Sequence, residues 1–191
     1  MRILIIDATR DRLFVAIADG ELAVKSVKGE GKKHLAALMP AIDGLLKEQS
    51  LALADIDILA AVNGPGSFTG IRIGIATANA IANALGKKLI DVNYLDIAAH
   101  GIKDTEFCAA IFGGHDYYAV RVKDGGREYC IMTEAELSAL AVPVYKRNED
   151  SDYFDSILSL VRERAGRGEF VAELRPNYFK PSQAERLTEQ L

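Results

Sequence analysis

The sequence predicts an α/β protein built from two half-domains, each with a mixed sheet and the element order strand, strand, strand, helix, strand, helix. Three observations lead to this fold class. Short apolar runs typical of strands alternate with helical patterns, three strands precede the first helix, and the same order starts again in the second half. At 191 residues the chain can bury about 70% of its unfolded surface. We expect the half-domains to be residues 1–102 and 103–191.

The first half opens with three expected strands, at Ile3–Ile6, Leu13–Ala18 and Glu21–Val27. The last two are joined by Asp19-Gly20, a pair typical of tight hairpin turns. The apolar spacing then predicts two helices and two strands in alternation. They are a helix over about Lys33–Glu48, a strand over Ile56–Val62, a helix after a glycine-rich stretch, and a strand over Lys88–Val92.

The second half repeats this order. Three strands are expected at Phe107–Phe112, Asp116–Val122 and Glu128–Met132, with turns at Gly113-Gly114 and Gly125-Gly126. A helix near Thr133–Leu140, a strand near Val142–Tyr145 and a helix near Tyr153–Arg164 follow. The two halves share no visible repeat of residues, so only the order of elements indicates that they are related.

Composition excludes several classes of protein. The net charge of -4 and the pI near 5.5 argue against autonomous binding to nucleic acid. No run approaches ~18 apolar residues, and Met1-Arg2 leads directly into a strand, so we expect a cytoplasmic protein without a signal peptide or membrane span. Cys108 and Cys130 lie in strand patterns without C-x-x-C spacing, which predicts buried free thiols.

The most informative segment is Asn63–Gly74, which reads N-G-P-G-S-F-T-G-I-R-I-G between a strand and a helix. Its glycines and proline suit a turn that needs positive φ or close backbone approach. Ser67 and Thr69 can cap the helix that follows, and a helix start attracts anions. The lysine of a phosphate-binding P-loop is missing. The segment therefore suits either a structural turn or a nucleotide cradle.

The helix after this segment has no charged residue from Ile73 to Gly86, so we expect nearly all of its sides to be packed against other parts of a protein. In the first helix, Leu35, Leu38, Ile42 and Leu45 should face the sheet. Both helices also have a face of small residues, where another helix could approach closely. These residues are Ala37, Ala41, Gly44, Gly70, Gly74, Ala78 and Ala82. The small faces either pack within the chain or form a protein-protein interface.

Gly64–Gly74 resembles the signature of the bacterial TsaB family, also called YeaZ, with Ile71 where leucine is usual. The resemblance continues over Ile3–Ile17 and His34–Leu46, and Pro176–Phe179 looks like the family's closing segment. Where the family pattern has Asp-Ala-Arg on the sixth strand, this chain has Ile111-Phe112-Gly113-Gly114. No role is therefore carried over from that arginine.

The resemblance implies a duplicated actin-like, ribonuclease-H-like (ASKHA) fold and a non-catalytic scaffold. In the family's system, threonylcarbamoyl is attached to the adenosine beside the anticodon of tRNAs that read codons beginning with A. TsaC makes threonylcarbamoyl-adenylate, TsaD transfers the group, and the ATPase TsaE binds across the TsaB-TsaD pair. The first two helices would bind TsaD, or a second copy of the chain when it is alone. The resemblance implies no cofactor in this subunit, with ATP or ADP and Mg²⁺ restricted to the shared interface and tRNA reached only through the complex.

No catalytic constellation is visible. His34, His100 and His115 are far apart in the sequence, and Gly64–Phe68 does not fit the G-x-S-x-G pattern of hydrolases. We therefore predict no catalytic or metal-binding residues. The alternatives are a small actin-like kinase or ATPase, a peptidase as the older label glycoprotease suggests, or a dimer with an unrelated client. A nucleotide site would use Asp7, Gly64, Pro65, Gly66, Ser67, Phe68, Thr69, Gly70 and Arg72, with Asp7 holding magnesium through water. Asp7 equally suits a turn, where its carboxylate would accept a hydrogen bond from the backbone N–H of Thr9 or Arg10.

Overall fold

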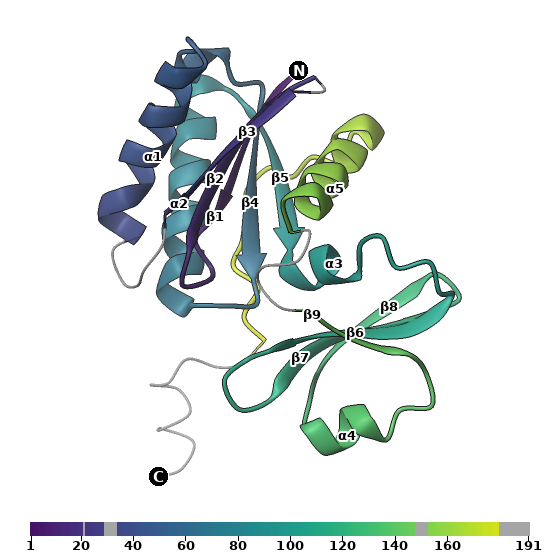
Figure 1. Cartoon of the computed structure of the whole chain (residues 1–191). Coiled ribbons are helices and arrows are strands. Elements are labelled where there is room, and N and C mark those ends of the chain that lie inside the picture. Colours follow the sequence, from purple (N-terminus) through teal and green to yellow (C-terminus); the bar gives the residue numbers. More distant parts are fainter. Residues whose placement is uncertain (21, 29–33, 148–152, 180–191) are drawn as a thin grey trace. The chain divides into compact units, whose positions relative to one another are not determined.

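The computed structural model describes residues 1–20, 22–28, 34–147 and 153–179 (Figure 1). It confirms the α/β class with two mixed sheets. The chain forms two compact units. Unit 1 comprises Met1–Val92 and Val161–Asn177, and unit 2 comprises Asn93–Leu160 with Tyr178 and Phe179. No helix in the described part of the chain is long and apolar enough to cross a membrane.

The sheet of unit 1 has the strand order β3-β2-β1-β4-β5. Its strands are β1 (Arg2–Asp7), β2 (Leu13–Asp19), β3 (Leu22–Lys28), β4 (Ile58–Gly64) and β5 (Lys88–Asn93). In β1, Ile5 pairs antiparallel with Ala16 of β2 and parallel with Ala60 of β4. All seven residues of β4 are buried, as expected of a parallel strand that is covered on both faces.

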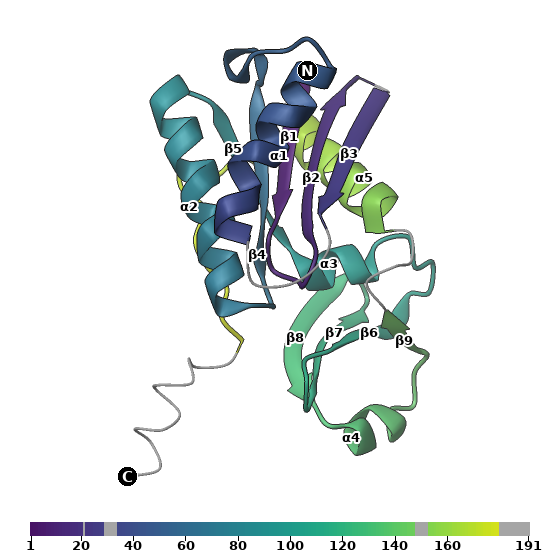
Figure 2. The same cartoon turned by 60° about the vertical axis from the view of Figure 1, so that its left-hand side comes forward.

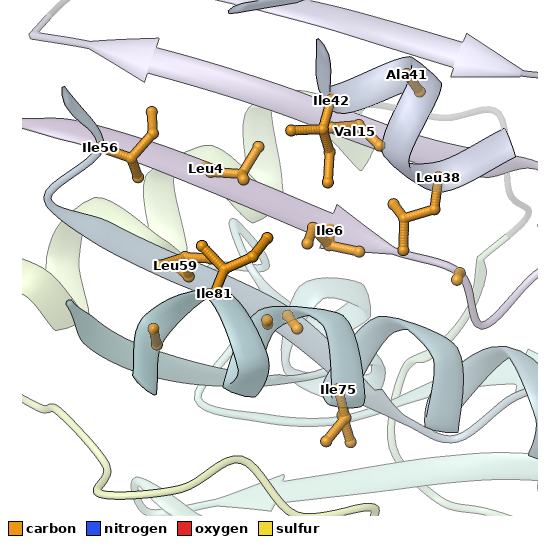
Figure 3. Close-up of a cluster of buried hydrophobic side chains, with 14 of the residues drawn as sticks. Leu4, Ile6, Val15, Leu38, Ala41, Ile42, Ile56, Leu59, Ile75 and Ile81 are labelled. Carbon is orange, nitrogen blue, oxygen red and sulfur yellow. The ribbon is translucent and has the colours of Figure 1, made fainter. Parts of the chain in front are cut away.

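Two helices lie side by side on one face of this sheet, α1 (His34–Glu48) and α2 (Phe68–Leu85) (Figures 1 and 2). A short 3-10 helix, η1 (Leu53–Asp55), leads into β4. Between the helices and the sheet lies the main apolar cluster. Figure 3 shows Leu38, Ile42 and Ile81 from the helices beside Leu4, Ile6 and Leu59 from the strands. Each such side chain contributes roughly 1.5–3 kcal/mol through burial.

The first helix differs from the expectation at one position. Leu38, Ile42 and Leu45 are buried against the sheet as predicted, but Leu35 is 76% exposed. Leu35 lies on the same side of the helix, one turn before the first buried residue. The periodicity is therefore right, but the apolar stripe continues beyond the end of the core that could cover it.

Unit 2 repeats the strand order on a smaller scale. Its sheet, β8-β7-β6-β9, corresponds strand for strand to β3-β2-β1-β4 of unit 1. As in unit 1, the first strand of the set, β6, pairs antiparallel with the second and parallel with the fourth. The strands are β6 (Glu106–Phe112), β7 (Tyr117–Lys123), β8 (Gly126–Met132) and β9 (Val144–Arg147), and the helices are α3 (Tyr94–Ala99), α4 (Glu134–Ser138) and the first part of α5 (Tyr153–Arg167).

The expected elements are present with small differences at their ends. Helix α4 is shorter than the predicted Thr133–Leu140, because Thr133 is its N-cap and forms a capping box with Glu136. Helix α3 was not predicted, since its six residues follow β5 without a break. Glu21 and Lys33, which the sequence placed in a strand and a helix, lie outside the described residues. Both cysteines are free thiols, as predicted, with Cys108 buried and Cys130 half-buried.

Candidate functional site

The glycine-rich segment, residues 63–70, connects β4 to α2 as predicted. Ser67 is the N-cap of α2, and its Oγ accepts a hydrogen bond from the backbone N–H of Gly70 at 3.2 Å. A helix leaves its first N–H groups without intrahelical partners, and this bond satisfies one of them. The predicted capping role of Ser67 is therefore confirmed.

Three glycines of the segment each allow the backbone of another part of unit 1 to come close. Gly64 has a positive φ of 125°, and a Cβ at this position would lie 2.5 Å from the carbonyl oxygen of Asn177. A Cβ on Gly66 would overlap the carbonyl oxygen of Thr9, and one on Gly70 would overlap that of Ala8. The glycines thus make a junction of the β1–β2 turn, the start of α2 and the C-terminal segment.

Hydrogen bonds hold this glycine junction together. The backbone N–H of Ser67 donates to the carbonyl of Thr9 at 2.7 Å, and the N–H of Asn177 donates to the carbonyl of Asn63 at 2.8 Å. An anion at the start of α2 would need such N–H groups, and the N–H of Ser67 is already bonded to the protein. The arrangement favours the structural turn over the nucleotide cradle.

Asp7 also has the geometry of a turn residue. Its side chain is 2% exposed, and Oδ1 accepts a hydrogen bond from the backbone N–H of Thr9 at 2.7 Å. Two neighbouring side-chain oxygens, Thr9 Oγ1 and Asn63 Oδ1, are buried and have no hydrogen-bond partner among the described residues. The carboxyl ends of β1 and β4 therefore form a polar part of an otherwise apolar interior.

The remaining loop positions differ in exposure. Pro65 is buried, whereas Thr69 and Arg72 are exposed. The guanidinium of Arg72 lies 3.9 Å from the centre of the Phe68 ring, a cation-π contact one turn along α2. Arg72 and Phe68 therefore contact each other on α2, with the Arg72 side chain at the surface.

The predicted small-residue faces lie mostly inside the chain. Ala78 and Ala82 of α2 are 0% and 3% exposed, and Ala41 of α1 is 3% exposed. Gly74 faces Ile6 and Ala8, which a Cβ would meet at 3.6 and 3.8 Å. The small residues thus allow α2 to lie close to its own sheet. Of the predicted positions, Gly44 is exposed and Ala37 is half-buried.

Another stripe of small residues lies at the surface of α2. Ala76, Ala80 and Ala84 are exposed at four-residue intervals, and the neighbouring α1 exposes Leu35 and Met39, the latter at 46%. We call these five residues the outer face. The sequence did not distinguish Ala76 from Ala78, because α2 carries alanine or glycine on every side.

A second polar cluster, in unit 2, was not predicted. The carboxylate of Asp96, 4% exposed, accepts hydrogen bonds from Arg127 Nη1 at 2.5 Å and from Tyr129 Oη at 2.6 Å. Burial, together with the bond to Asp96, raises the pKa of Tyr129 to about 12. The cluster ties α3 to β8. Arg127 and Tyr129 lie 31 and 33 positions after Asp96 in the sequence, so no local sequence pattern identifies the cluster.

The histidines do not form a site within the described residues. His34 Nε2 lies 2.6 Å from the carbonyl oxygen of Arg10, while His115 pairs with Asp116 on an exposed hairpin. Across the described ranges, no three histidine, cysteine, aspartate or glutamate side chains gather in a way that could hold a metal ion.

Comparison with known proteins identifies the family. The sequence profile of the TsaD family, tRNA N6-adenosine threonylcarbamoyltransferase, matches residues 28–146, more than half of the chain. The transferase of Rhizobium etli is 37% identical over 90 residues, which make up 44% of this chain and 25% of that protein. That of Chelativorans sp. is 45% identical over 65 residues, 34% of this chain and 18% of that protein. The matches thus span a quarter or less of these relatives' length.

Solved structures with this fold cover nearly the whole chain. YeaZ from Pseudomonas aeruginosa has a TM-score of 0.73 at 22% identity, with 93% of this chain and 99% of that chain covered. The filament protein AlfA from a B. subtilis plasmid has a TM-score of 0.52 at 7% identity, with 96% and 93% covered. These likenesses show the fold alone.

The chain belongs to the TsaD family and has the YeaZ (TsaB) fold.

Proposed function

We propose that this TsaD-family chain is a non-catalytic subunit of the bacterial complex that adds threonylcarbamoyl to the adenosine beside the anticodon. The tRNAs concerned read codons beginning with A. The chain would bind a TsaD-like transferase through its outer face and support the transferase's working conformation. A partner stabilises one conformation only as far as it binds that form better. Membership of the TsaD family and the YeaZ fold support the assignment of this chain to the tRNA modification system.

The observation that carries this proposal is the outer face. The small side chains of Ala76, Ala80 and Ala84 let another helix approach closely, and the neighbouring helix α1 also exposes two apolar side chains, Leu35 and Met39. Exposed apolar side chains on neighbouring helices favour protein-protein contacts. The pairing surface is therefore on the two helices named by the resemblance, but on different residues.

The proposal includes further partners. When the transferase is absent, a second copy of the chain would cover the outer face and give a homodimer. A TsaE-like ATPase would bind across the subunit and the transferase, with ATP or ADP and Mg²⁺ at their shared interface. The tRNA would be reached only through the complex, because the chain is acidic. With these partners, the proposal is of a cytoplasmic protein.

The proposal is tested by charging the outer face. Ala76→Glu and Met39→Glu change exposed positions, so both proteins should fold but bind the transferase, and themselves, at least tenfold more weakly. Ala54→Glu, another exposed alanine of unit 1, is the control and should pair normally. Sedimentation velocity gives the association constants. Wild-type affinity of both charged variants would contradict the proposal.

A second experiment separates the outer face from the glycine junction as the working element. In a reconstituted mixture of TsaB-, TsaC-, TsaD- and TsaE-type proteins, Ser67→Ala should retain most tRNA modification, since a lost helix cap costs about 0.5–2 kcal/mol and leaves the fold. Ala76→Glu should lose most of it. The opposite pattern, with Ser67→Ala folded but inactive, would make the glycine junction the active element.

One observation favours the alternative of an actin-like kinase or ATPase acting alone. Asp7 lies buried at the end of β1, close in sequence to the buried Thr9 Oγ1, which has no hydrogen-bond partner among the described residues. Under this alternative, highly purified protein would hydrolyse ATP and Asp7→Asn would abolish the turnover. We propose the opposite result, no hydrolysis and no peptide cleavage by the protein alone.

A further inference from the structure

After α5 the chain returns along unit 1 as an extended segment, Val171–Asn177, which we call the strap. In Figures 1 and 2 it is the yellow segment that passes beside β5 and α2. Its start pairs with the edge of the sheet, where the N–H of Val171 donates to the carbonyl of Leu89 at 3.0 Å. Its end lies in the glycine junction, where Asn177 bonds to Asn63 and its carbonyl lies against Gly64.

Asn79 on α2 binds the middle of the strap. Its Nδ2 donates to the carbonyl of Leu174 at 3.0 Å, and its Oδ1 accepts from the N–H of the same residue at 2.9 Å. One side chain thus satisfies both backbone groups of Leu174, as a neighbouring strand would. The side chain of Leu174 is 1% exposed and belongs to the apolar core of unit 1. Asparagine is a poor helix former but carries both a donor and an acceptor on a short stem.

The sheet side of α2 explains why such a tie is needed. In its first half, α2 approaches the sheet through Gly70, Gly74 and Ala78, which carry little or no side chain. Further along, the large side chain of Ile81 belongs to the apolar cluster between the helices and the sheet (Figure 3). Large interdigitating side chains resist the sliding of one element over another, and small ones do so less. The hydrogen bonds of Asn79 are directional, so they fix the position of the middle of α2 along its own axis and its rotation about that axis.

We infer that Asn79 and the strap are positioning elements for the outer face. The inference rests on the proposed function. They hold α2 so that Ala76 and Ala80 are presented in the arrangement that a partner binds, although neither Asn79 nor the strap belongs to the outer face. By linkage, a partner on the outer face must also stabilise the bonds between Asn79 and the strap. The C-terminal segment thereby influences pairing from a distance.

The first test needs no partner. In Asn79→Ala, the methyl NMR signals of Ala76, Ala80 and Ala84 should shift or broaden, and hydrogen exchange of the Leu174 amide should rise at least tenfold. Asn83→Ala is the matched control, because Asn83 lies one turn further along α2 and is exposed. It should leave the Leu174 amide unchanged. Asn79→Asp keeps the acceptor and loses the donor, so its exchange rate should be intermediate.

The second test separates positioning from stability. Ile17→Val shortens a buried side chain on β2, remote in sequence from α2 and the strap, and serves as a destabilised reference. At an equal loss of Tm, Asn79→Ala should weaken self-association or transferase binding at least fivefold more than Ile17→Val. Equal weakening by both variants would overturn the inference, as would unchanged methyl signals in Asn79→Ala. A wild-type protein that pairs with nothing would contradict the proposed function, and the methyl signals would still decide this inference.

Discussion

The two units share one strand order but differ in how their sheets are covered. Six of the seven residues of β2 in unit 1 are buried, whereas its counterpart in unit 2, β7, buries two of seven. Strand β2 is covered by α1, a helix of 15 residues, while α4 has five. The same strand order is therefore stabilised by different interactions in the two units. Unit 1 is stabilised mainly by apolar burial, and unit 2 relies more on polar contacts such as those of Asp96.

The largest expected effect is in the core of unit 1. Ala78→Glu should unfold the protein or render it insoluble, because Ala78 is 0% exposed and an unpaired buried carboxylate costs more than about 4 kcal/mol. Circular dichroism and thermal melting measure the loss. Ala76→Glu, two residues away on the exposed side of α2, is the control. A folded Ala78→Glu monomer would instead support the interface that the sequence alone placed on this face.

A smaller effect is expected at the glycines of unit 1. Gly70→Ala should destabilise the protein by about 1–3 kcal/mol, because the new methyl group would overlap the carbonyl oxygen of Ala8. Gly44→Ala is the matched change in α1, where a Cβ meets nothing within 4 Å. It should stabilise by about 0.5–1 kcal/mol, since alanine favours a helix. Urea unfolding gives both values. Equal effects would mean that the glycine junction tolerates side chains.

The smallest effect concerns unit 2 and compares two tyrosines. Tyr129 and Tyr145 each donate to an aspartate at 2.6 Å, but Asp96 is buried and Asp104 is exposed. Tyr129→Phe should cost about 1 kcal/mol and Tyr145→Phe less than about 0.5 kcal/mol, because water replaces the bond at an exposed site. Differential scanning calorimetry measures both. A larger cost at Tyr145 would contradict the importance of the bonds to the buried carboxylate of Asp96 in unit 2.

The turn and the helix cap of the candidate site could be predicted from the sequence. The side of α2 that faces the solvent could not. The glycines and Ser67 of residues 63–70 predicted a turn and a helix cap, since both depend on local geometry. The direction of the small faces could not be predicted for α2, because no charged residue marks a solvent side between Ile73 and Gly86. For the same reason the sequence assigned Ala78 to a small-residue face and did not single out Ala76, whereas the structure buries Ala78 and exposes Ala76.

By itself the sequence determined the α/β class, the order of the elements and the family resemblance, because apolar periodicity and turn residues act over a few positions. The tertiary structure alone decided that the chain crosses between units after Val92, Leu160 and Asn177, where the sequence suggested one boundary after residue 102. It also decided that Asn79 meets Leu174, 95 positions away. Contacts at such separations leave no mark in local pattern, since they depend on where packing brings distant segments together.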